Sequence, residues 1–284
     1  MPNSKDIRTG PEAQGESQWG PPSGTLGQLI AQAWERSQAL SSSVLEAIAP
    51  PLAGSVPSLR AALGKDKVAV IAEVKRSSPS RGSINPGIDA AEQARSYAAG
   101  GAAAISVLTE SNRFGGSNED LSLVRTATSL PILRKDFHVS ELQLSEAARL
   151  GASGALLIVR AIQPSRLRAL AQAGRDLGLD LVFEVRDMFE LSRALAAGAE
   201  IIGVNNRNLE TLRMDPTTVG RIVPLIPREC VAIAESGYAN RDDIESAALA
   251  GADAVLVGSS LSGSLDPMEA VRSITGVPKR LRDS

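Results

Sequence analysis

Eight short apolar runs, many of them rich in β-branched residues, recur between residues 68 and 258 and constrain the fold more than any other feature. The runs are VAVIAEV (68–74), AISVL (104–108), PILR (131–134), GALLIV (154–159), LVFEV (181–185), IIGV (201–204), VAIA (231–234) and AVLVG (254–258). Most of them are too continuously apolar for a half-exposed strand. They therefore predict strands that are buried on both faces, as in a parallel sheet.

Helix-length segments with start and stop signals separate these runs. Ser140 followed by Gln143 forms a capping box, and Asp215-Pro216 and Asp266-Pro267 each place a capping residue before a proline at the first helical position. A Gly-Ala pair precedes every second strand, at intervals of about 50 residues. We interpret each of these glycines as a left-handed residue that ends the preceding helix. The alternative is that the repeat reflects descent from a duplicated segment of two strand–helix units.

Eight strand–helix units within about 200 residues predict an α/β fold, a closed (β/α)8 TIM barrel. An open doubly wound sheet is the alternative, but it usually carries a glycine-rich dinucleotide loop after its first strand, where this chain has KRSSPSRGS. The chain then divides into a mobile tail (1–24), which is poor in hydrophobic residues, an N-terminal helical extension (25–65) and the barrel as catalytic domain (66–284).

Composition excludes several classes of function. The net charge of −2 argues against a nucleic-acid binder, and a single Cys and a single His exclude a disulfide framework and a His-based metal site. We expect Cys230 to be a buried structural thiol and His138 to lie in a loop. No apolar run is long enough to span a membrane, and the N-terminus lacks the apolar region of a signal peptide. A cytoplasmic monomer is expected.

Polar residues follow most of the predicted strands at their carboxyl ends, where barrels of this type carry their active sites. They are Glu73, Lys75 and Ser78; Ser106; Lys135; Glu184; Asn205, Asn206 and Arg207; Glu235 and Ser236; and Ser259 and Ser260. Buried ionisable groups cost several kcal/mol unless they are paired. The set therefore predicts one site, in which Lys and Glu side chains act as general acid and base once burial shifts their pKa values.

The last two strand ends read AESG (234–237) and VGSSL (257–261), a combination typical of phosphate-binding barrels. Gly237 and Gly258 allow the backbone to approach an anion closely, and Arg207 could add a charged contact. Phe114 and Phe137 fall in loops that follow strands, where they could form a wall against a ring. These features predict a phosphorylated substrate.

Six segments together resemble one family, indole-3-glycerol phosphate synthase. They are IAEVKRSSPSRGSI (71–84), ISVLTE followed by FGGSNEDL (105–121), PILRKDFHV (131–139), GVNNRNLETL (203–212), IAESGY (233–238) and VLVGSSL (255–261). The resemblance extends from about residue 57 to residue 265, with the segments in the family's order and spacing.

The resemblance implies a reaction and a set of residues. The substrate would be a phosphorylated anthranilate derivative, 1-(2-carboxyphenylamino)-1-deoxyribulose 5-phosphate, which loses CO2 and water as its pyrrole ring closes, without a metal or cofactor. Lys135 would be the general acid and Glu184 would transfer protons, although the division of acid and base steps between them stays open. The remaining matched positions are Glu73, Lys75 and Asn205 in catalysis; Ser78, Pro79, Ser106, Phe114, Phe137, Glu235 and Ser236 in substrate binding; and Arg207, Gly237, Gly258 and Ser259 in phosphate binding.

Two other functions compete with this one. Phosphoribosylanthranilate isomerase is similar at the phosphate end, but it relies on a Cys near the first strand, whereas Cys230 precedes the seventh run. A non-catalytic paralogue would be expected to have lost the converging charges, all of which are present here.

Overall fold

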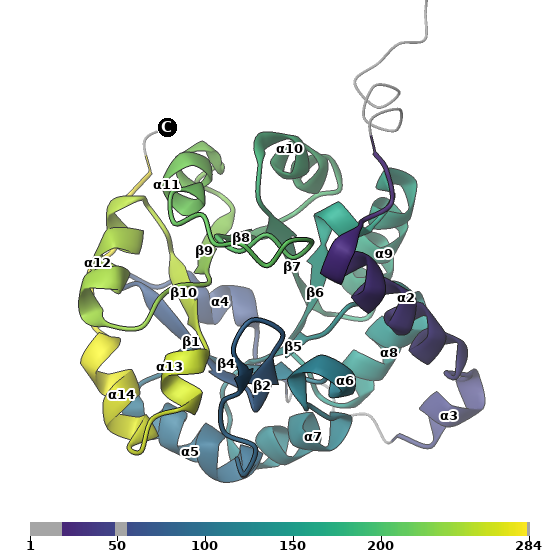
Figure 1. Ribbon diagram of the computed structural model, residues 1–284, viewed down its shortest axis with the longest axis horizontal. Helices are drawn as coiled ribbons and strands as arrows, with labels where there is room; N and C mark the ends of the chain where they lie inside the picture. Colours follow the sequence, from purple (N-terminus) through teal and green to yellow (C-terminus); the bar gives the residue numbers. More distant parts are fainter. Residues whose placement is uncertain (1–18, 49–55, 283–284) are drawn as a thin grey trace, which may run out of the picture.

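A closed barrel of parallel strands forms the centre of the protein (Figure 1). The structure, a computed structural model, describes residues 19–48 and 56–282. Around the barrel the strands follow in the order of the sequence, and the last pairs with the first. Their bounds are β1 Ala69–Val74, β4 Ala104–Leu108, β5 Ile132–Lys135, β6 Gly154–Ile158, β7 Asp180–Val185, β8 Ile201–Asn205, β9 Val231–Glu235 and β10 Ala254–Val257. Each predicted apolar run forms one of these strands, which confirms the (β/α)8 barrel.

Helices cover the outside of the barrel (Figure 1). The main ones are α5 Ala90–Gly100, α7 Asn118–Ala127, α8 Glu141–Arg149, α9 Pro164–Asp176, α10 Met188–Ala196, α11 Thr218–Ile222, α12 Arg241–Leu249 and α14 Pro267–Ile274. Gly101, Gly151, Gly198 and Gly251 follow four of them with φ between 77° and 95°. The left-handed glycines predicted before every second strand are thus confirmed.

Two of the three predicted helix starts are confirmed. The Ser140–Gln143 capping box opens α8, and Asp266 caps α14 ahead of Pro267. The predicted start at Asp215 is wrong, because α11 begins at Thr218 with Thr217 as its N-cap. The Asp215 carboxylate instead accepts hydrogen bonds from the backbone N–H and the hydroxyl of Thr217. It therefore stabilises a turn ahead of the helix.

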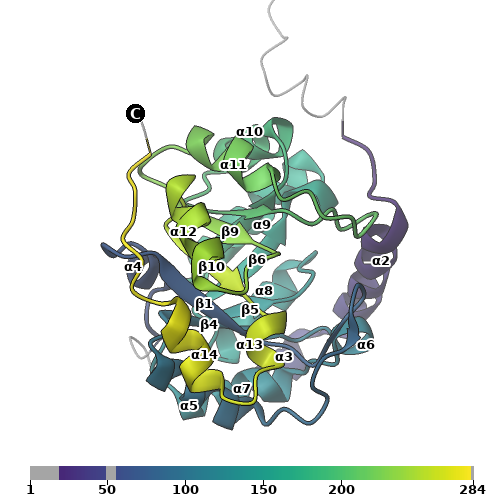
Figure 2. The ribbon, with the colours of Figure 1, turned by 60° about the vertical axis from the view of Figure 1, so that its left-hand side comes forward.

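The N-terminal extension forms helices that lie against the barrel. They are α2 Gly24–Gln38, α3 Ser42–Glu46 and α4 Leu59–Leu63. Helix α2 buries Leu26, Leu29, Ile30 and Ala33, and it lies beside the short helix α6 Ser111–Phe114 (Figure 2). The predicted N-terminal helical extension is therefore confirmed.

Residues 19–24, which the sequence placed in the mobile tail, are instead bonded to the barrel. The Trp19 indole donates to the carbonyl of Arg160, and the backbone N–H of Ser23 donates to the Glu210 carboxylate at 2.7 Å. The rest of the predicted tail, residues 1–18, lies outside the described residues.

A small antiparallel hairpin, β2 Ser77–Ser78 and β3 Gly82–Ser83, follows β1 and was not predicted. Its two strands are only two residues long, so they carry no periodic pattern that a sequence could display. The Ser77 hydroxyl donates to the carbonyl of Arg113. Together with α2 and α6, the hairpin lies in front of the barrel as seen in Figure 1.

The amino-terminal end of the barrel is closed by packing and by one buried arginine. Cys230 is buried there and its thiol donates to the carbonyl of Ala199, in agreement with the predicted structural role. Arg282 donates to the Asp253 carboxylate and to the carbonyls of Ile226, Pro227, Cys230 and Gly251. Within residues 19–48 and 56–282, no helix is long and apolar enough to cross a membrane.

Replacing Arg282 with Ala should lower the free energy of unfolding by about 3 kcal/mol, because four buried carbonyls and Asp253 lose a charged donor. Urea denaturation measures this change. Arg280→Ala removes the same charge from an exposed neighbour and should change stability by less than about 0.5 kcal/mol. Equal stability of the two variants would contradict the assigned role.

Candidate active site

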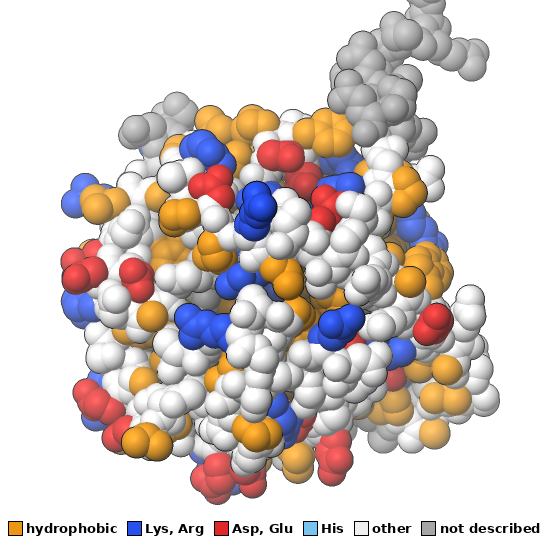
Figure 3. Space-filling view, in the orientation of Figure 1, with side chains coloured by type: hydrophobic (Ala, Val, Ile, Leu, Met, Phe, Trp, Pro, Cys, Tyr) orange, Lys and Arg blue, Asp and Glu red, His pale blue; other side chains and the backbone are white. Residues whose placement is uncertain are grey.

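A cavity of about 220 Å³ opens at the carboxyl ends of the barrel strands. The predicted site residues that line it are Glu73, Lys75, Ser78, Pro79, Phe114, Lys135, Phe137, Glu184, Asn205, Arg207, Glu235, Ser236, Gly237, Gly258 and Ser259. Ser260 also lines it, whereas Ser106 and Asn206 of the predicted set do not. Leu156 and Ile158 of β6 line it too, so residues from all eight barrel strands converge on one space. Several Lys and Arg side chains surround the middle of this face (Figure 3).

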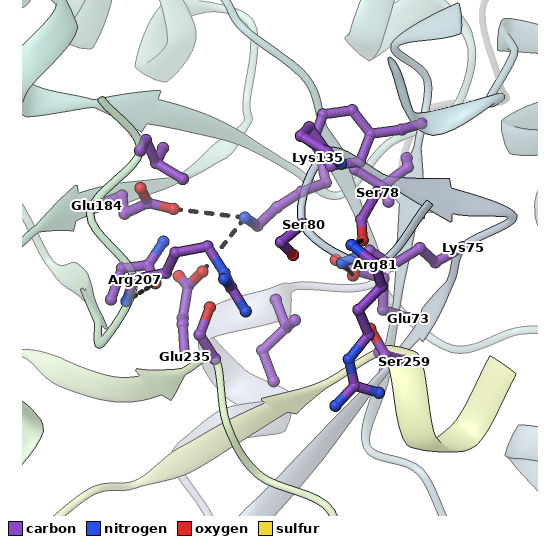
Figure 4. A pocket seen from close by; sticks show the side chains of 18 of the residues that line it. Glu73, Lys75, Ser78, Ser80, Arg81, Lys135, Glu184, Arg207, Glu235 and Ser259 are labelled. Atoms are coloured by element: carbon purple, nitrogen blue, oxygen red, sulfur yellow. Dashed lines mark hydrogen bonds and ion pairs between the residues drawn. The ribbon is translucent and has the colours of Figure 1, made fainter. Parts of the chain in front are cut away.

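Lys135, the last residue of β5, lies between two carboxylates in the centre of the cavity (Figure 4). Its Nζ is 3.4 Å from an oxygen of Glu184 and 3.2 Å from an oxygen of Glu235. Both glutamates stand at the ends of their strands, β7 and β9, and only 3% and 2% of their side chains are exposed. The parallel barrel brings these three groups together because each lies at a strand's carboxyl end.

The environment raises the pKa values of both Lys135 and Glu235. Burial opposes the charge on Lys135, but the carboxylates of Glu235, Glu184 and Glu73 outweigh it and raise the pKa of the ammonium group. Burial also raises the pKa of Glu235 to about 7, against the opposing effect of Lys135, and the negative charge of Glu184 adds to the rise. Lys135 is therefore a charged acid at neutral pH, while Glu235 can gain or lose a proton there.

A second pair of charges lies at the carboxyl end of β1. Lys75 Nζ lies 3.1 Å from the Glu73 carboxylate, whose other oxygen accepts from the Ser106 hydroxyl at 3.1 Å. Burial would raise the pKa of Glu73, but Lys75 and then Lys135 hold it below its usual value. Ser106, fully buried on β4, thus lies behind Glu73 and orients it, whereas the sequence suggested a direct contact with substrate.

An aromatic wall borders this pair. The rings of Phe114 and Phe137 are 6.3 Å apart between centroids, and the Lys75 ammonium lies 5.8 Å from the centre of the Phe114 ring. An aromatic ring bound here would have apolar neighbours on one side and a cation at its edge.

Two glycines make room for the carboxylates. A Cβ on Gly203 of β8 would collide with Oε1 of Glu235, and one on Gly258 would stand 2.5 Å from Oε1 of Glu73. Gly258, predicted to let an anion approach, therefore also gives space to the Glu73 carboxylate. Gly203 belongs to the GVNNRN segment, but its own role was not foreseen.

The predicted phosphate end lies on the loops after β8, β9 and β10. Asn205 accepts a hydrogen bond from the backbone N–H of Arg207, whose guanidinium donates to the carbonyl of Leu212. Ser236 and Gly237 both have positive φ, 66° and 95°, a conformation that is strained for serine and that is often retained at functional sites. Helix α13 Ser259–Ser262 is only four residues long. The predicted phosphate end of the cavity therefore offers an anion individual backbone N–H groups rather than a helix dipole.

The cavity also contains residues that the sequence analysis did not single out. Asp136 follows Lys135 and is held by Arg36 of α2 at 2.8 Å and by the hydroxyl of Thr109 at 2.6 Å. Arg81 reaches the cavity from the hairpin and Leu29 from α2. Asp136 could have been found as part of RKDF. The positions of Arg81 and Leu29 depend on how the hairpin and α2 fold over the barrel, and no local sequence pattern reveals this.

His138 lies in the predicted loop and away from the cavity lining. Its Nδ1 pairs with the carbonyl of Leu156 at 2.9 Å. Burial and the positive charge of Arg134 lower its pKa to about 4, so the imidazole is neutral near pH 7. The sequence expectation of a loop residue is confirmed.

Fold and site together define a (β/α)8-barrel enzyme with a cavity suited to acid–base chemistry on an anionic small molecule. The model of the family "Indole-3-glycerol phosphate synthase" matches residues 28–274. The chain belongs to this family, which makes it a carboxy-lyase of tryptophan biosynthesis.

Named relatives support the assignment over most of their length. An indole-3-glycerol phosphate synthase of a Nocardioides species is 55% identical over 208 residues, which cover 73% of this chain and 80% of the relative. The enzyme of Rhodococcus jostii is 49% identical over 228 residues, covering 80% and 83%. Indole-3-glycerol phosphate synthase 1 of Streptomyces coelicolor is 50% identical over 214 residues, covering 75% and 80%.

Two solved structures share the fold at low sequence identity. A thiamine phosphate pyrophosphorylase from Pyrococcus furiosus has a TM-score of 0.55 and 19% identity, covering 75% of this chain and 95% of that one. KGPDC from Streptococcus mutans has a TM-score of 0.57 and 14% identity, covering 73% and 95%. They indicate the barrel alone.

Replacing Gly203 with Ala should reduce kcat/KM by about 100-fold, because the new methyl group pushes Glu235 away from Lys135 and small displacements of reacting groups are costly. Steady-state turnover measures the loss. Gly220→Ala is the matched control, since a Cβ at Gly220 meets nothing within 4 Å. Unchanged turnover in the Gly203 variant would show that the position of Glu235 is not critical.

Proposed function

We propose that this cavity converts 1-(2-carboxyphenylamino)-1-deoxyribulose 5-phosphate to indole-3-glycerol phosphate, with Lys135 as the central acid. The observation that supports this most is the buried ammonium of Lys135 between the carboxylates of Glu184 and Glu235. Family membership supplies the reaction, and the cluster supplies groups for each of its proton transfers.

The reaction needs an acid at two points and a base at one. The ring carbon that bears the carboxylate attacks the ketone carbon, and the ketone oxygen takes up a proton. Loss of CO2 then restores the aromatic ring. Finally the new hydroxyl leaves as water after a second protonation, while a proton departs from the neighbouring ring carbon and completes the pyrrole.

Lys135 fits the first protonation, because its raised pKa keeps it charged and a cation stabilises the oxygen as negative charge develops. In the dehydration, we assign Glu184 to protonation of the hydroxyl and Glu235 to removal of the ring proton. Both carboxylates lie within 3.5 Å of the Lys135 ammonium, so the proton that Glu235 removes can return to Lys135. Solvent supplies the proton that Glu184 donates, which balances the loss of CO2 from a carboxylate.

The rest of the substrate would extend from this centre in two directions. Lys75 would hold the carboxylate, with Phe114, Phe137 and Pro79 against the anthranilate ring. Asn205 and Glu73 would position the hydroxyls, with Ser106 holding Glu73 in place. The remaining contacts are Ser78 and Ser236 to the substrate and Arg207, Gly237, Gly258 and Ser259 to the phosphate.

The catalytic unit comprises the barrel (66–284) and the helical extension (25–65). Leu29 of α2 lines the cavity together with barrel residues, so a single chain supplies both parts. We accordingly propose a monomeric enzyme that acts in the cytoplasm, where its small-molecule substrate is made and used.

Lys135→Ala should reduce kcat by about 10³-fold, within the range that a positioned general acid contributes. The measurement is formation of the fluorescent indole product from the synthetic substrate. Lys65→Ala, which removes an exposed lysine, should match the parent enzyme. A folded parent protein without turnover would refute the proposed function, and a fully active Lys135 variant would refute the role of Lys135.

The activity should also depend on the ionisation of Glu235. Because its pKa is about 7 and the ionised carboxylate is the base, kcat/KM should rise as the pH increases through 7. Glu235→Gln cannot ionise, so its residual activity should lose this limb of the profile. A variant that keeps the same limb would assign the titration to another group.

A further inference from the structure

We propose that Arg81, in the loop of the β2–β3 hairpin, is a second cationic ligand of the substrate phosphate and acts opposite Arg207. This rests on the proposed function, since it takes the phosphorylated substrate as given. It adds a residue that neither the motifs nor the comparisons assign to the site.

Arg81 and Arg207 reach the same part of the cavity from different elements. Both line it, together with Gly237, Gly258 and Ser259. Figure 4 shows Arg81 and Ser259 on one side and Arg207 on the other. An anion that contacts the backbone at Gly258 and Ser259 therefore lies between two guanidinium groups.

These two arginines differ from the other cations of the cavity. Lys75 and Lys135 each pair with buried glutamates. The Arg81 guanidinium forms no hydrogen bond or ion pair with any residue of 19–48 and 56–282, and that of Arg207 donates only to the carbonyl of Leu212 within the same ranges. Two positive groups that face one space without a carboxylate between them are suited to a doubly charged anion.

The electrostatics agree with this geometry. Burial lowers the pKa of Arg207, and the positive charge of Arg81 lowers it further, as expected for two cations that line the same cavity. A phosphate carries about 1.5 to 2 negative charges at pH 7. Its binding would replace the repulsion between the arginines with two attractive contacts.

The hairpin is attached to the side of the cavity where the phosphate is expected. Asn85 donates to the carbonyl of Ser262 at 3.3 Å, and the Ser262 hydroxyl accepts from the backbone N–H of Lys75 at 3.1 Å. Within the loop, the backbone N–H of Arg81 donates to the hydroxyl of Ser78 at 3.2 Å. The backbone at Arg81 is thus held in place while its side chain stays free to meet a ligand.

The test compares Arg81→Ala, Arg81→Lys and Arg280→Ala with the parent enzyme. KM for the substrate and the inhibition constant of inorganic phosphate should both rise about 10- to 100-fold in Arg81→Ala, the range of a charged hydrogen bond. The phosphate group does not react, so kcat should stay within about threefold. Arg81→Lys should recover part of the loss, and Arg280→Ala, at the other end of the barrel, should change nothing.

Ionic strength separates a charge effect from a structural one. Arg81 is exposed, so the difference between Arg81→Ala and the parent should shrink as salt rises and screens the arginine. A difference that does not depend on salt, or a fall in kcat with KM unchanged, would overturn the proposal. The proposal would also be overturned if KM and the inhibition constant of phosphate in Arg81→Ala stayed within about twofold of the parent values.

Failure of the Arg81 assignment can be distinguished from failure of the proposed function. Calorimetric titration with inorganic phosphate measures binding to the folded protein without turnover. If the parent binds phosphate, Arg81→Ala binds it more weakly and neither turns over substrate, the assignment of Arg81 stands and the proposed function fails. If the parent turns over substrate and Arg81→Ala equals it in both measurements, the assignment of Arg81 fails alone.

Discussion

The contact of Lys135 with Glu184 and Glu235 is the interaction on which the rest of the site depends. A lone ammonium or carboxylate at this depth would be strongly destabilised by loss of water, and mutual attraction offsets this cost only when the groups are held close together. The barrel provides that closeness, because its parallel strands end side by side. Even so, three glutamates face two lysines, which leaves one negative charge in excess. Burial chiefly raises the pKa of Glu235, and the negative charge of Glu184 adds to the rise.

The N-terminal extension is attached at two places that both adjoin the cavity. Arg36 of α2 pairs with Asp136, the residue after Lys135. At the other end of α2, Ser23 bonds to Glu210, and the backbone N–H of Thr25 donates to the carbonyl of Glu210. Glu210 belongs to the same loop as Arg207. The extension therefore stabilises the loop after Lys135 and the loop that carries Arg207, and it does so with ion pairs as well as apolar packing.

The sequence was sufficient for features that depend on the chain's own regular pattern. Apolar runs gave the strands to within a residue or so, and the rule that barrels act at strand ends led to Lys135 and Glu184. The sequence was less informative where the contacts of a side chain depend on residues far away in the chain. Ser106 turned out to orient Glu73 because it lies opposite Glu73 in the register between β1 and β4. The partnership of Glu235 with Lys135 joins β9 to β5 across the barrel, and no spacing in the sequence encodes it.

The distribution of charge along the cavity also explains how one substrate orientation would be favoured. Glutamates surround the two lysines in the centre of the cavity, whereas Arg81 and Arg207, at the proposed phosphate end, have no acidic partner among residues 19–48 and 56–282. A substrate with a doubly charged phosphate is repelled from the centre and attracted to that end, which leaves its single carboxylate for Lys75. Decarboxylation removes the negative charge of this carboxylate. The product thereby loses the contact of the carboxylate with Lys75, so decarboxylation also weakens the binding of the product to the cavity.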